Sequence, residues 1–347
     1  MITKIAQFCV MQEPANFDPI PIFAAEDLDF KSKALSLFRF QYQHNEVYRQ
    51  YCELIHCLPN KVDRLSAIPF LPISFFKTRN VTTTCFQPEV IFESSKTTGT
   101  IPSRHLLKEA SLYEQSYLQS FELFYGDVKK YCIIGLLPSY LERESSSLVY
   151  MVNDLIKRSA NESSGFYLHD FESLYKLLKH NEANAQPTLL FGVTFALLDF
   201  ASAYPLPLHY TTIIETGGMK GRKKEMTRED VHAELAGKFK TKAIHSEYGM
   251  TELLSQAYAL DKGLFNCPPW MCILVRDTDD PFMVRCKEAS LASINGLGNV
   301  IDLANIYSCA FIATDDVVKL HPNGTFEVMG RADNSDIRGC SLMVSAL

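Results

Sequence analysis

Five short motifs along the chain combine hydroxyl, glycine and charged residues in patterns that suit nucleotide chemistry. The first is a Ser/Thr/Gly loop at residues 94–100 (SSKTTGT). Its backbone N–H groups and hydroxyls can donate hydrogen bonds to a polyphosphate. The second is ETGG at residues 215–218, directly after a strand-like run, and its paired glycines let a planar ligand approach the backbone closely. Taken alone, each of these two motifs also fits an ordinary turn.

The remaining three motifs add aromatic and charged groups. In YGMTE (248–252), a tyrosine can stack on a base, a threonine can bond a phosphate, and a carboxylate can hold Mg²⁺. TDD (314–316) is followed, after a turn, by GRAD (330–333). An aspartate can accept hydrogen bonds from both ribose hydroxyls, and a nearby arginine can neutralise phosphate charge.

These motifs need a framework, and the hydrophobic pattern predicts an α/β one. Strand-like runs at residues 187–191, 210–214 and 242–245 alternate with helical segments, and residues 105–124 have the pattern of an amphipathic helix. Residues 29–58 also have a helical pattern. The last hundred residues are short β-type pieces separated by turns. We therefore expect mixed β-sheets flanked by helices, with a β-rich C-terminal portion.

Composition excludes several other classes of protein. The net charge of −6 over 347 residues argues against nucleic acid as the main partner. The ten cysteines lack the close, even spacing of a disulfide framework. The longest apolar stretch, residues 189–198, is far shorter than the roughly 20 residues of a membrane span. An early apolar run soon meets Gln12, Glu13 and Pro14, which makes a poor signal peptide, so we expect a cytoplasmic location.

The order SSKTTG, ETGG, YGMTE, TDD, GRAD resembles the adenylate-forming superfamily of acyl-CoA synthetases, luciferases and peptide-synthetase adenylation domains. A narrower likeness lies in residues 68–77 (IPFLPISFFK), 92–99 (FESSKTTG), 136–152 (LLPSYLERESSSLVYMV) and 330–343 (GRADNSDIRGCSLM). These segments resemble the LuxE-type acyl-protein synthetase, the fatty-acid–protein ligase of bacterial fatty-acid reductase complexes. Phenylacetate–CoA ligases are the next nearest relatives.

The resemblance implies that the chain binds ATP and Mg²⁺ and assigns a role to each motif. The implied contacts are Ser94, Ser95, Lys96, Thr97, Thr98 and Gly99 with the phosphates, Thr216, Gly217 and Gly218 with adenine and ribose, Tyr248 with the base beside Gly249 and Met250, Thr251 with the α-phosphate, Glu252 with Mg²⁺, Asp316 with the ribose, and Arg331 with ribose or phosphate. Two positions depart from the family pattern. Lys96 replaces the usual glycine, and TDD replaces TGD, where the register favours Asp316 over Asp315.

The last residues of the sequence include a candidate for the group that accepts the acyl chain. Relatives continue beyond GRxD with a small domain that supplies a lysine, whereas this sequence stops 14 residues after Asp333 (347 − 333). We therefore expect an adenylate-forming domain over residues 1–330, no small C-terminal domain, and a tail over residues 331–347. Cys340 in that tail would accept the acyl group as a thioester, and Arg338 nearby would lower its thiol pKa.

By the same resemblance, the substrate is a fatty or aryl acid, and the partner is an NADPH-dependent acyl reductase that yields an aldehyde. Three alternatives stay open: an aryl- or acyl-CoA ligase, a non-catalytic nucleotide-binding partner subunit, and transfer to a carrier protein. His105 and His245 flank two of the motifs, and we expect them to line the pocket. The sequence does not specify the chain length of the acid.

Overall fold

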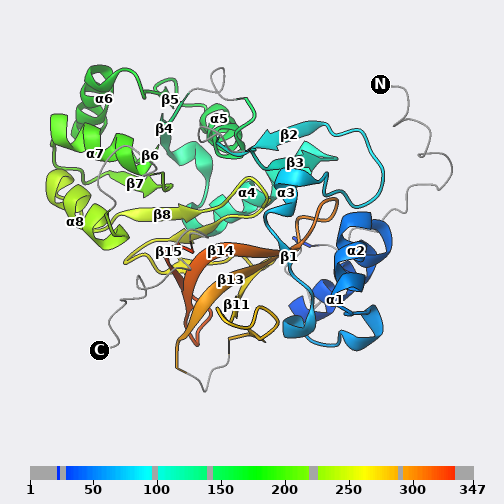
Figure 1. The fold of residues 1–347 in the computed structure, drawn as a ribbon. Helices are drawn as coiled ribbons and strands as arrows, with labels where there is room; N and C mark the ends of the chain where they lie inside the picture. Colours follow the sequence, from blue (N-terminus) through cyan, green and yellow to red (C-terminus); the bar gives the residue numbers. More distant parts are fainter. Residues whose placement is uncertain are drawn as a thin grey trace.

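The computed structural model describes residues 22–23, 29–95, 101–138, 144–218, 226–287 and 292–332. Within these ranges, thirteen strands form one mixed sheet, and β2 (Val90–Glu93) pairs with β3 (Arg104–Leu107) in a separate hairpin (Figure 1). The expected α/β class with mixed sheets is confirmed. Every helix in these ranges is too short or too polar to span a bilayer.

One part of the sheet is parallel, in the order β5–β4–β6–β7–β8. Its strands are β4 (Cys132–Leu136), β5 (Gly165–Phe166), β6 (Thr188–Gly192), β7 (Thr211–Glu215) and β8 (His245–Tyr248). The helices that connect them are α5 (Ser147–Ser159), α6 (Phe171–Ala183), α7 (Thr194–Ala203) and α8 (Arg228–Phe239). Every residue of β4 and β6 is buried, which is why both strands are almost continuously apolar in sequence.

The C-terminal part of the sheet is antiparallel, which confirms the expected β-rich portion (Figure 1). Its strands are β9 (Ala257–Ala259), β10 (Phe265–Asn266), β11 (Met271–Arg276), β12 (Val284–Arg285), β13 (Ile294–Asp302), β14 (Phe311–Leu320) and β15 (Phe326–Arg331). The short β1 (Leu71–Pro72) adds a parallel pairing to β14. The two parts join because β9 pairs antiparallel with β8.

The helical pattern over residues 29–58 forms two helices rather than one. α1 (Phe30–His44) and α2 (Glu46–Leu54) are separated by Asn45, whose backbone is extended. The side-chain oxygen of Asn45 accepts a hydrogen bond from the Tyr48 N–H and caps α2, while its amide donates to the Ser308 carbonyl 3.0 Å away. The break therefore depends on a tertiary contact that helix periodicity does not reveal.

Three other predicted boundaries also move. Residues 105–107 belong to β3, and the expected helix, α4 (Ala110–Tyr125), begins after them. The strand expected at residues 242–245 lies further along, as β8. The apolar run at residues 189–198 divides into β6 and α7. The helical turns α3 (Phe75–Thr78), η1 (Pro59–Lys61), η2 (Leu65–Ala67) and η3 (Val128–Lys130) complete the described elements.

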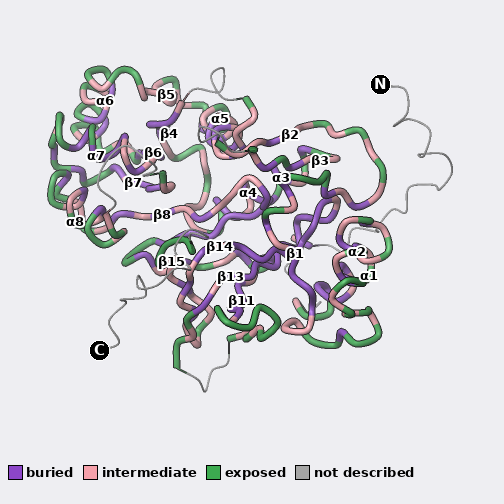
Figure 2. The backbone as a smooth tube through the Cα atoms, viewed as in Figure 1, coloured by how far each residue is buried: buried purple, intermediate pink, exposed green. Residues whose placement is uncertain are grey.

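Buried side chains form two apolar clusters, and the strands and the inward faces of the helices carry most of the buried residues (Figure 2). Successive residues of β4 enter different clusters, Ile133 the larger and Ile134 the smaller, because side chains alternate across a strand. The larger cluster joins α1 to the antiparallel strands, where Phe38 meets the ring of Phe311 edge-on at 6.2 Å. The smaller one is formed with α6, α7 and α8.

Gln41 joins α1 to the loop before β14, and its removal is expected to destabilise the fold. Its amide donates to the carbonyls of Asn305 and Ile306 at 2.8 and 2.9 Å, and its oxygen accepts from the Ala310 N–H at 2.9 Å. Gln41→Ala leaves these buried groups unpaired, so we expect a loss of about 2–4 kcal/mol in the free energy of unfolding.

Urea denaturation followed by far-UV circular dichroism measures this loss. The matched control is Gln43→Ala, since the side chain of Gln43 is exposed two residues away, and its change should stay within about 0.5 kcal/mol. Equal stabilities of the two variants would contradict the role assigned to Gln41.

Candidate active site

A cavity of about 200 Å³ brings three of the sequence motifs together. Its wall includes Ser95 from the phosphate-loop motif, Thr216 from ETGG, and Gly249, Met250 and Thr251 from YGMTE. β7 and β8 are parallel neighbours, so the segments that follow them lie at the same edge of the sheet. Ligands of α/β sheets bind at the carboxyl ends of such strands. The geometry is that of a ligand site.

The two ends of the β2–β3 connection, which contains the phosphate-loop motif, are tied together. The Ser94 N–H donates to the Ser103 carbonyl at 3.0 Å, and the Ser103 N–H donates to the Ser94 hydroxyl at 2.9 Å. The motif is therefore the connection of the β2–β3 hairpin, which holds Ser95 at the cavity. Lys96, Thr97, Thr98 and Gly99 lie outside the described residues, and their phosphate contacts stay predictions.

The ETGG motif follows β7 directly, as its sequence predicted. Gly217 and Gly218 have φ angles of 78° and 101°, in a region that residues with a side chain rarely adopt. The Thr216 N–H donates to the Gly192 carbonyl at 3.0 Å, and the Thr194 N–H donates to the Gly217 carbonyl at 2.9 Å. These bonds fix the loop against the segment after β6 and leave Thr216 in the cavity wall.

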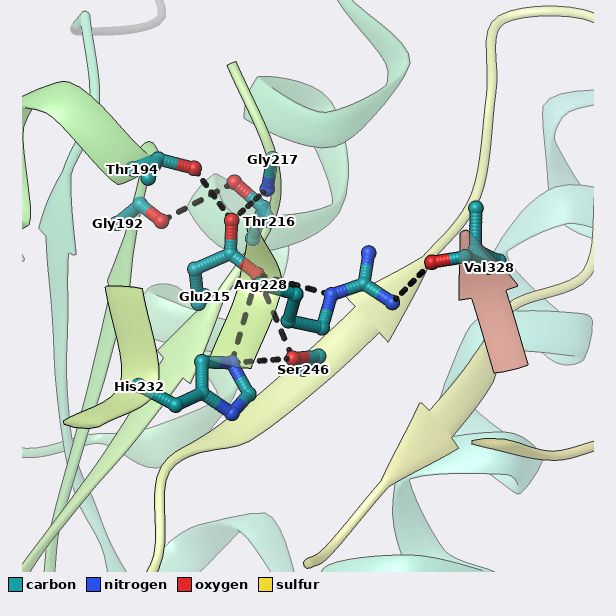
Figure 3. Close-up of polar contacts among 9 residues, drawn as sticks. All are labelled: Gly192, Thr194, Glu215, Thr216, Gly217, Arg228, His232, Ser246 and Val328. Atoms are coloured by element: carbon teal, nitrogen blue, oxygen red, sulfur yellow. Dashed lines mark hydrogen bonds and ion pairs between the residues drawn. The ribbon is translucent and has the colours of Figure 1, made fainter. Parts of the chain in front are cut away.

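Glu215 organises this loop, although the sequence analysis gave it no role (Figure 3). One carboxylate oxygen accepts hydrogen bonds from the Thr194 hydroxyl and from the Gly217 N–H, the latter at 2.8 Å. The other lies 3.4 Å from the Ser246 hydroxyl and 3.9 Å from both Arg228 Nε and His232 Nε2. A glutamate at the end of a buried strand was the available sequence signal.

The surroundings of Glu215 favour its charged form. Burial acts to raise the carboxyl pKa, but the contacts with His232, Arg228 and Thr194 outweigh it and hold the pKa below its usual value. Arg228 also donates to the Val328 carbonyl in β15 at 3.4 Å (Figure 3). Its guanidinium lies 4.9 Å from the centre of the Phe265 ring. Glu215 and Arg228 therefore connect the ETGG loop to the antiparallel strands.

Tyr248 faces the TDD motif rather than the cavity. It is absent from the described cavity wall, and its ring packs edge-on against Phe265 and Phe326 at centroid distances of 5.8 and 5.4 Å. Its hydroxyl donates to Asp316 Oδ2 at 2.8 Å, and Arg331 Nε lies 3.4 Å from Asp316 Oδ1. Of the two candidate aspartates, Asp316 is the one in this cluster. The predicted packing of Tyr248 on a base stays a prediction.

His105 contacts the backbone of the YGMTE motif. It is almost fully buried, and its Nδ1 lies 2.8 Å from the Thr251 carbonyl oxygen, while Nε2 lies 3.1 Å from Asn305 Oδ1. Burial lowers the pKa of His105 to about 4, although both hydrogen bonds act in the opposite direction. His245 stacks on Tyr125 at 5.8 Å. Neither histidine lies among the described residues of this cavity wall, and the expectation that they line the nucleotide pocket stays a prediction.

Glu252 is held beside the end of the phosphate-loop motif. The residue is 5% exposed, and Ser103 lies close enough to act against the rise in its carboxyl pKa. Burial raises its carboxyl pKa, and the charges of Arg331 and Lys77 offset this only in part. A divalent cation bound to the Glu252 carboxylate would lower this pKa further. Mg²⁺ at nucleotide sites takes one or two carboxylates with the phosphates and water, so this oxygen ligand fits the ion.

Replacing the carboxylate of Glu215 with an amide is expected to destabilise the protein in a pH-dependent way. Glu215→Gln keeps the shape but turns an NH₂ group toward other donors, and we expect a loss of about 1–3 kcal/mol at pH 7. Because the folded-state pKa is below the usual 4.5, the carboxylate stabilises the fold above that pH. The difference between wild type and variant should persist from pH 7 to 4.5 and narrow at lower pH.

Urea denaturation across this pH range is the measurement. Glu162→Gln, which alters an exposed glutamate, provides the control and should match the wild type at every pH. A Glu215→Gln variant as stable as the wild type at pH 7 would show that the carboxylate does not hold the loop.

Comparisons with solved structures agree with this fold. ATP-bound MatB from Rhodopseudomonas palustris is 16% identical, with a TM-score of 0.52, and the match covers 70% of this chain and 47% of that one. An ATP-bound RpMatB-BxBclM chimera, B3, gives the same values. The chain thus spans about half the length of these structures. A search of curated proteins found no match.

A family model gives the more specific result. The model described as "Acyl-protein synthetase, LuxE" matches residues 18–347, which is nearly the whole chain. Together with a cavity walled by the ordered motifs, this match agrees with the resemblance seen in the sequence. The chain belongs to the LuxE acyl-protein synthetase family and has the fold of adenylate-forming enzymes.

Proposed function

We propose that this chain uses ATP to convert a carboxylic acid into an acyl-adenylate and then holds the acyl group as a thioester on Cys340. The observation that carries the proposal is the convergence of Ser95, Thr216 and Thr251 on one cavity, in a chain of the acyl-protein synthetase family. In this proposal, residues 1–330 form the adenylate-forming domain and residues 331–347 the acceptor tail.

In the first step, an oxygen of the acid attacks the α-phosphorus of ATP, and the bond to pyrophosphate breaks. Thr251, in the cavity wall, donates its hydroxyl to an α-phosphate oxygen as negative charge develops there. The open backbone at Gly217 and Gly218 admits the adenosine part. Asp316 accepts hydrogen bonds from the ribose hydroxyls, and Tyr248 and Arg331 already hold that carboxylate in place.

The phosphates need a counter-charge. Glu252 would hold Mg²⁺ near the phosphate-loop motif, because its carboxyl lies near Ser103, a few residues after that motif. When bound, Mg²⁺ neutralises part of the phosphate charge and favours pyrophosphate as the leaving group. Positioning of the acid and the phosphates supplies the rest of the catalysis.

In the second step, the Cys340 thiolate attacks the acyl carbonyl carbon, a C–S bond forms, and AMP leaves with the electrons of the C–O bond. The thiol proton is released to solvent. Cys340 and Arg338 lie outside the described residues, so this step rests on the family and the sequence. The thioester would pass to an NADPH-dependent acyl reductase, where hydride transfer gives an aldehyde and frees the thiol.

Pyrophosphate exchange tests the first step, and two neighbouring aspartates provide a matched pair. With fatty and aryl acids, we expect the wild type to incorporate labelled pyrophosphate into ATP. Asp316→Asn should raise the KM for ATP roughly 10- to 100-fold, the effect of losing hydrogen bonds to a charged group. Asp315→Asn removes the same charge one residue away and should change the KM for ATP little. Equal effects of the two substitutions would refute the assignment of the ribose contact to Asp316.

Intact mass spectrometry tests the second step. After incubation with Mg-ATP and an acid that supports exchange, the wild type should gain the mass of one acyl group, which hydroxylamine removes as it does for thioesters. Cys340→Ser should still exchange pyrophosphate but form no hydroxylamine-labile adduct. The control Cys286→Ser should label normally. Label on another cysteine, or equally efficient transfer to free CoA, would rule out Cys340 as the acceptor.

A further inference from the structure

The cavity has a second region of wall that none of the nucleotide motifs accounts for. Tyr113 comes from α4, Leu148 and Met151 from α5, and Glu247 and Gln256 from β8 and the segment before β9. The nucleotide motifs supply Ser95, Thr216 and the segment from Gly249 to Thr251. In the proposed adenylation, this remaining region is the part of the wall available to the acyl part of the acid.

Glu247 stands out in this region because its carboxyl lines the cavity without a partner. Within the described part of the chain, it forms no hydrogen bond or ion pair. A Cβ atom built on Gly249 would lie 2.4 Å from Glu247 Oε1, so the glycine makes room for the carboxyl. The other glutamate of the wall, Glu93, is instead ion-paired with Arg104 at 3.7 Å.

The chemical state of Glu247 differs from that of an ordinary glutamate. Burial, with a smaller contribution from the negative charge of Glu215, raises its pKa to about 8. At neutral pH the group is mainly a carboxylic acid, with an O–H that can donate. Gln256 stands in the same wall, and its side-chain oxygen is buried with no partner among the described residues. This region of the wall therefore offers unfilled hydrogen-bonding capacity.

We propose that Glu247 is a specificity-determining residue that donates a hydrogen bond to an uncharged polar group, a hydroxyl or carbonyl oxygen, on the acyl part of the acid. The inference rests on the proposed adenylation and names the class of acid. An unsubstituted alkyl chain would cover Glu247 and leave its O–H buried and unpaired, which is costly. A site built to hydrogen-bond its substrate rejects an analogue that lacks the group far more strongly than it rejects a small change in length.

Matched acids test this directly through pyrophosphate exchange. Each pair shares one chain length and differs by a single hydroxyl or oxo group, whose position is varied along the chain. For at least one pair, we expect the wild type to show a kcat/KM at least about tenfold higher for the substituted acid, the effect of one hydrogen bond. Glu247→Gln keeps a donor and should retain the preference. Glu247→Leu should abolish or reverse it while still accepting unsubstituted acids.

Two further readouts separate this role from a merely structural one. The preference of the wild type should fall as the pH rises through about 8, where Glu247 loses its proton, and that of Glu247→Gln should not. Glu93→Leu, which alters the other glutamate of the wall, should leave the ratio between paired acids unchanged because Arg104 already pairs with that carboxylate. Thermal unfolding of each variant confirms that it is folded.

Each remaining outcome has a definite meaning. A wild type that prefers unsubstituted acids, or a ratio that Glu247→Leu does not change, overturns the inference. A preference for acids with an ammonium group also overturns it, because Glu247 would then act as an ion-pairing carboxylate. If none of the acids supports pyrophosphate exchange, in the wild type or in any variant, the proposed function itself fails, and this inference fails with it.

Discussion

Parallel pairing between β7 and β8 is the constraint on which the site depends. Ile214 pairs with His245 and Glu215 with Ser246, so the segments after both strands emerge at one edge of the sheet. Two motifs more than thirty positions apart in sequence therefore meet without any loop having to reach far. The Glu215 carboxylate then holds the two segments together at this edge, because it accepts a hydrogen bond from the ETGG backbone and lies beside Ser246 of β8.

The site is held by buried polar groups that would be costly without their partners. Asp302 accepts hydrogen bonds from the N–H groups of Leu254 and Ser255 at 2.7 and 3.0 Å, which fixes the chain just after Glu252. Arg276 donates to the Asn299 side chain at 2.8 Å and to the Thr314 carbonyl at the start of TDD. Burial raises the pKa of Asp302 and lowers that of Arg276. The hydrogen bonds to Asp302 and the negative charges of Asp315 and Asp316 near Arg276 counter these shifts. Such groups keep the segments of the candidate site in place before any ligand binds.

Local patterns in the sequence were enough to predict the α/β class and the β-rich C-terminal part, and the resemblance to adenylate-forming enzymes indicated the loops that meet at the cavity. Local patterns did not predict features that depend on contacts between residues far apart in the sequence. Asn45 breaks a helix because its side-chain amide donates to the Ser308 carbonyl, a residue far along the chain. The role of Glu215, at the end of β7, depends on Arg228 and His232 in α8, and spacing along the chain does not reveal these contacts.

Transfer of an oxygen atom from the acid to AMP tests the central claim most directly. An acid labelled with ¹⁸O in its carboxylate is incubated with Mg-ATP and the wild-type chain, and AMP is analysed by mass spectrometry. Because the acid oxygen bonds to the α-phosphorus and stays with AMP when the thiol attacks, the account predicts one ¹⁸O atom in each AMP released. Unlabelled AMP, or label in ADP or inorganic phosphate instead, would contradict it.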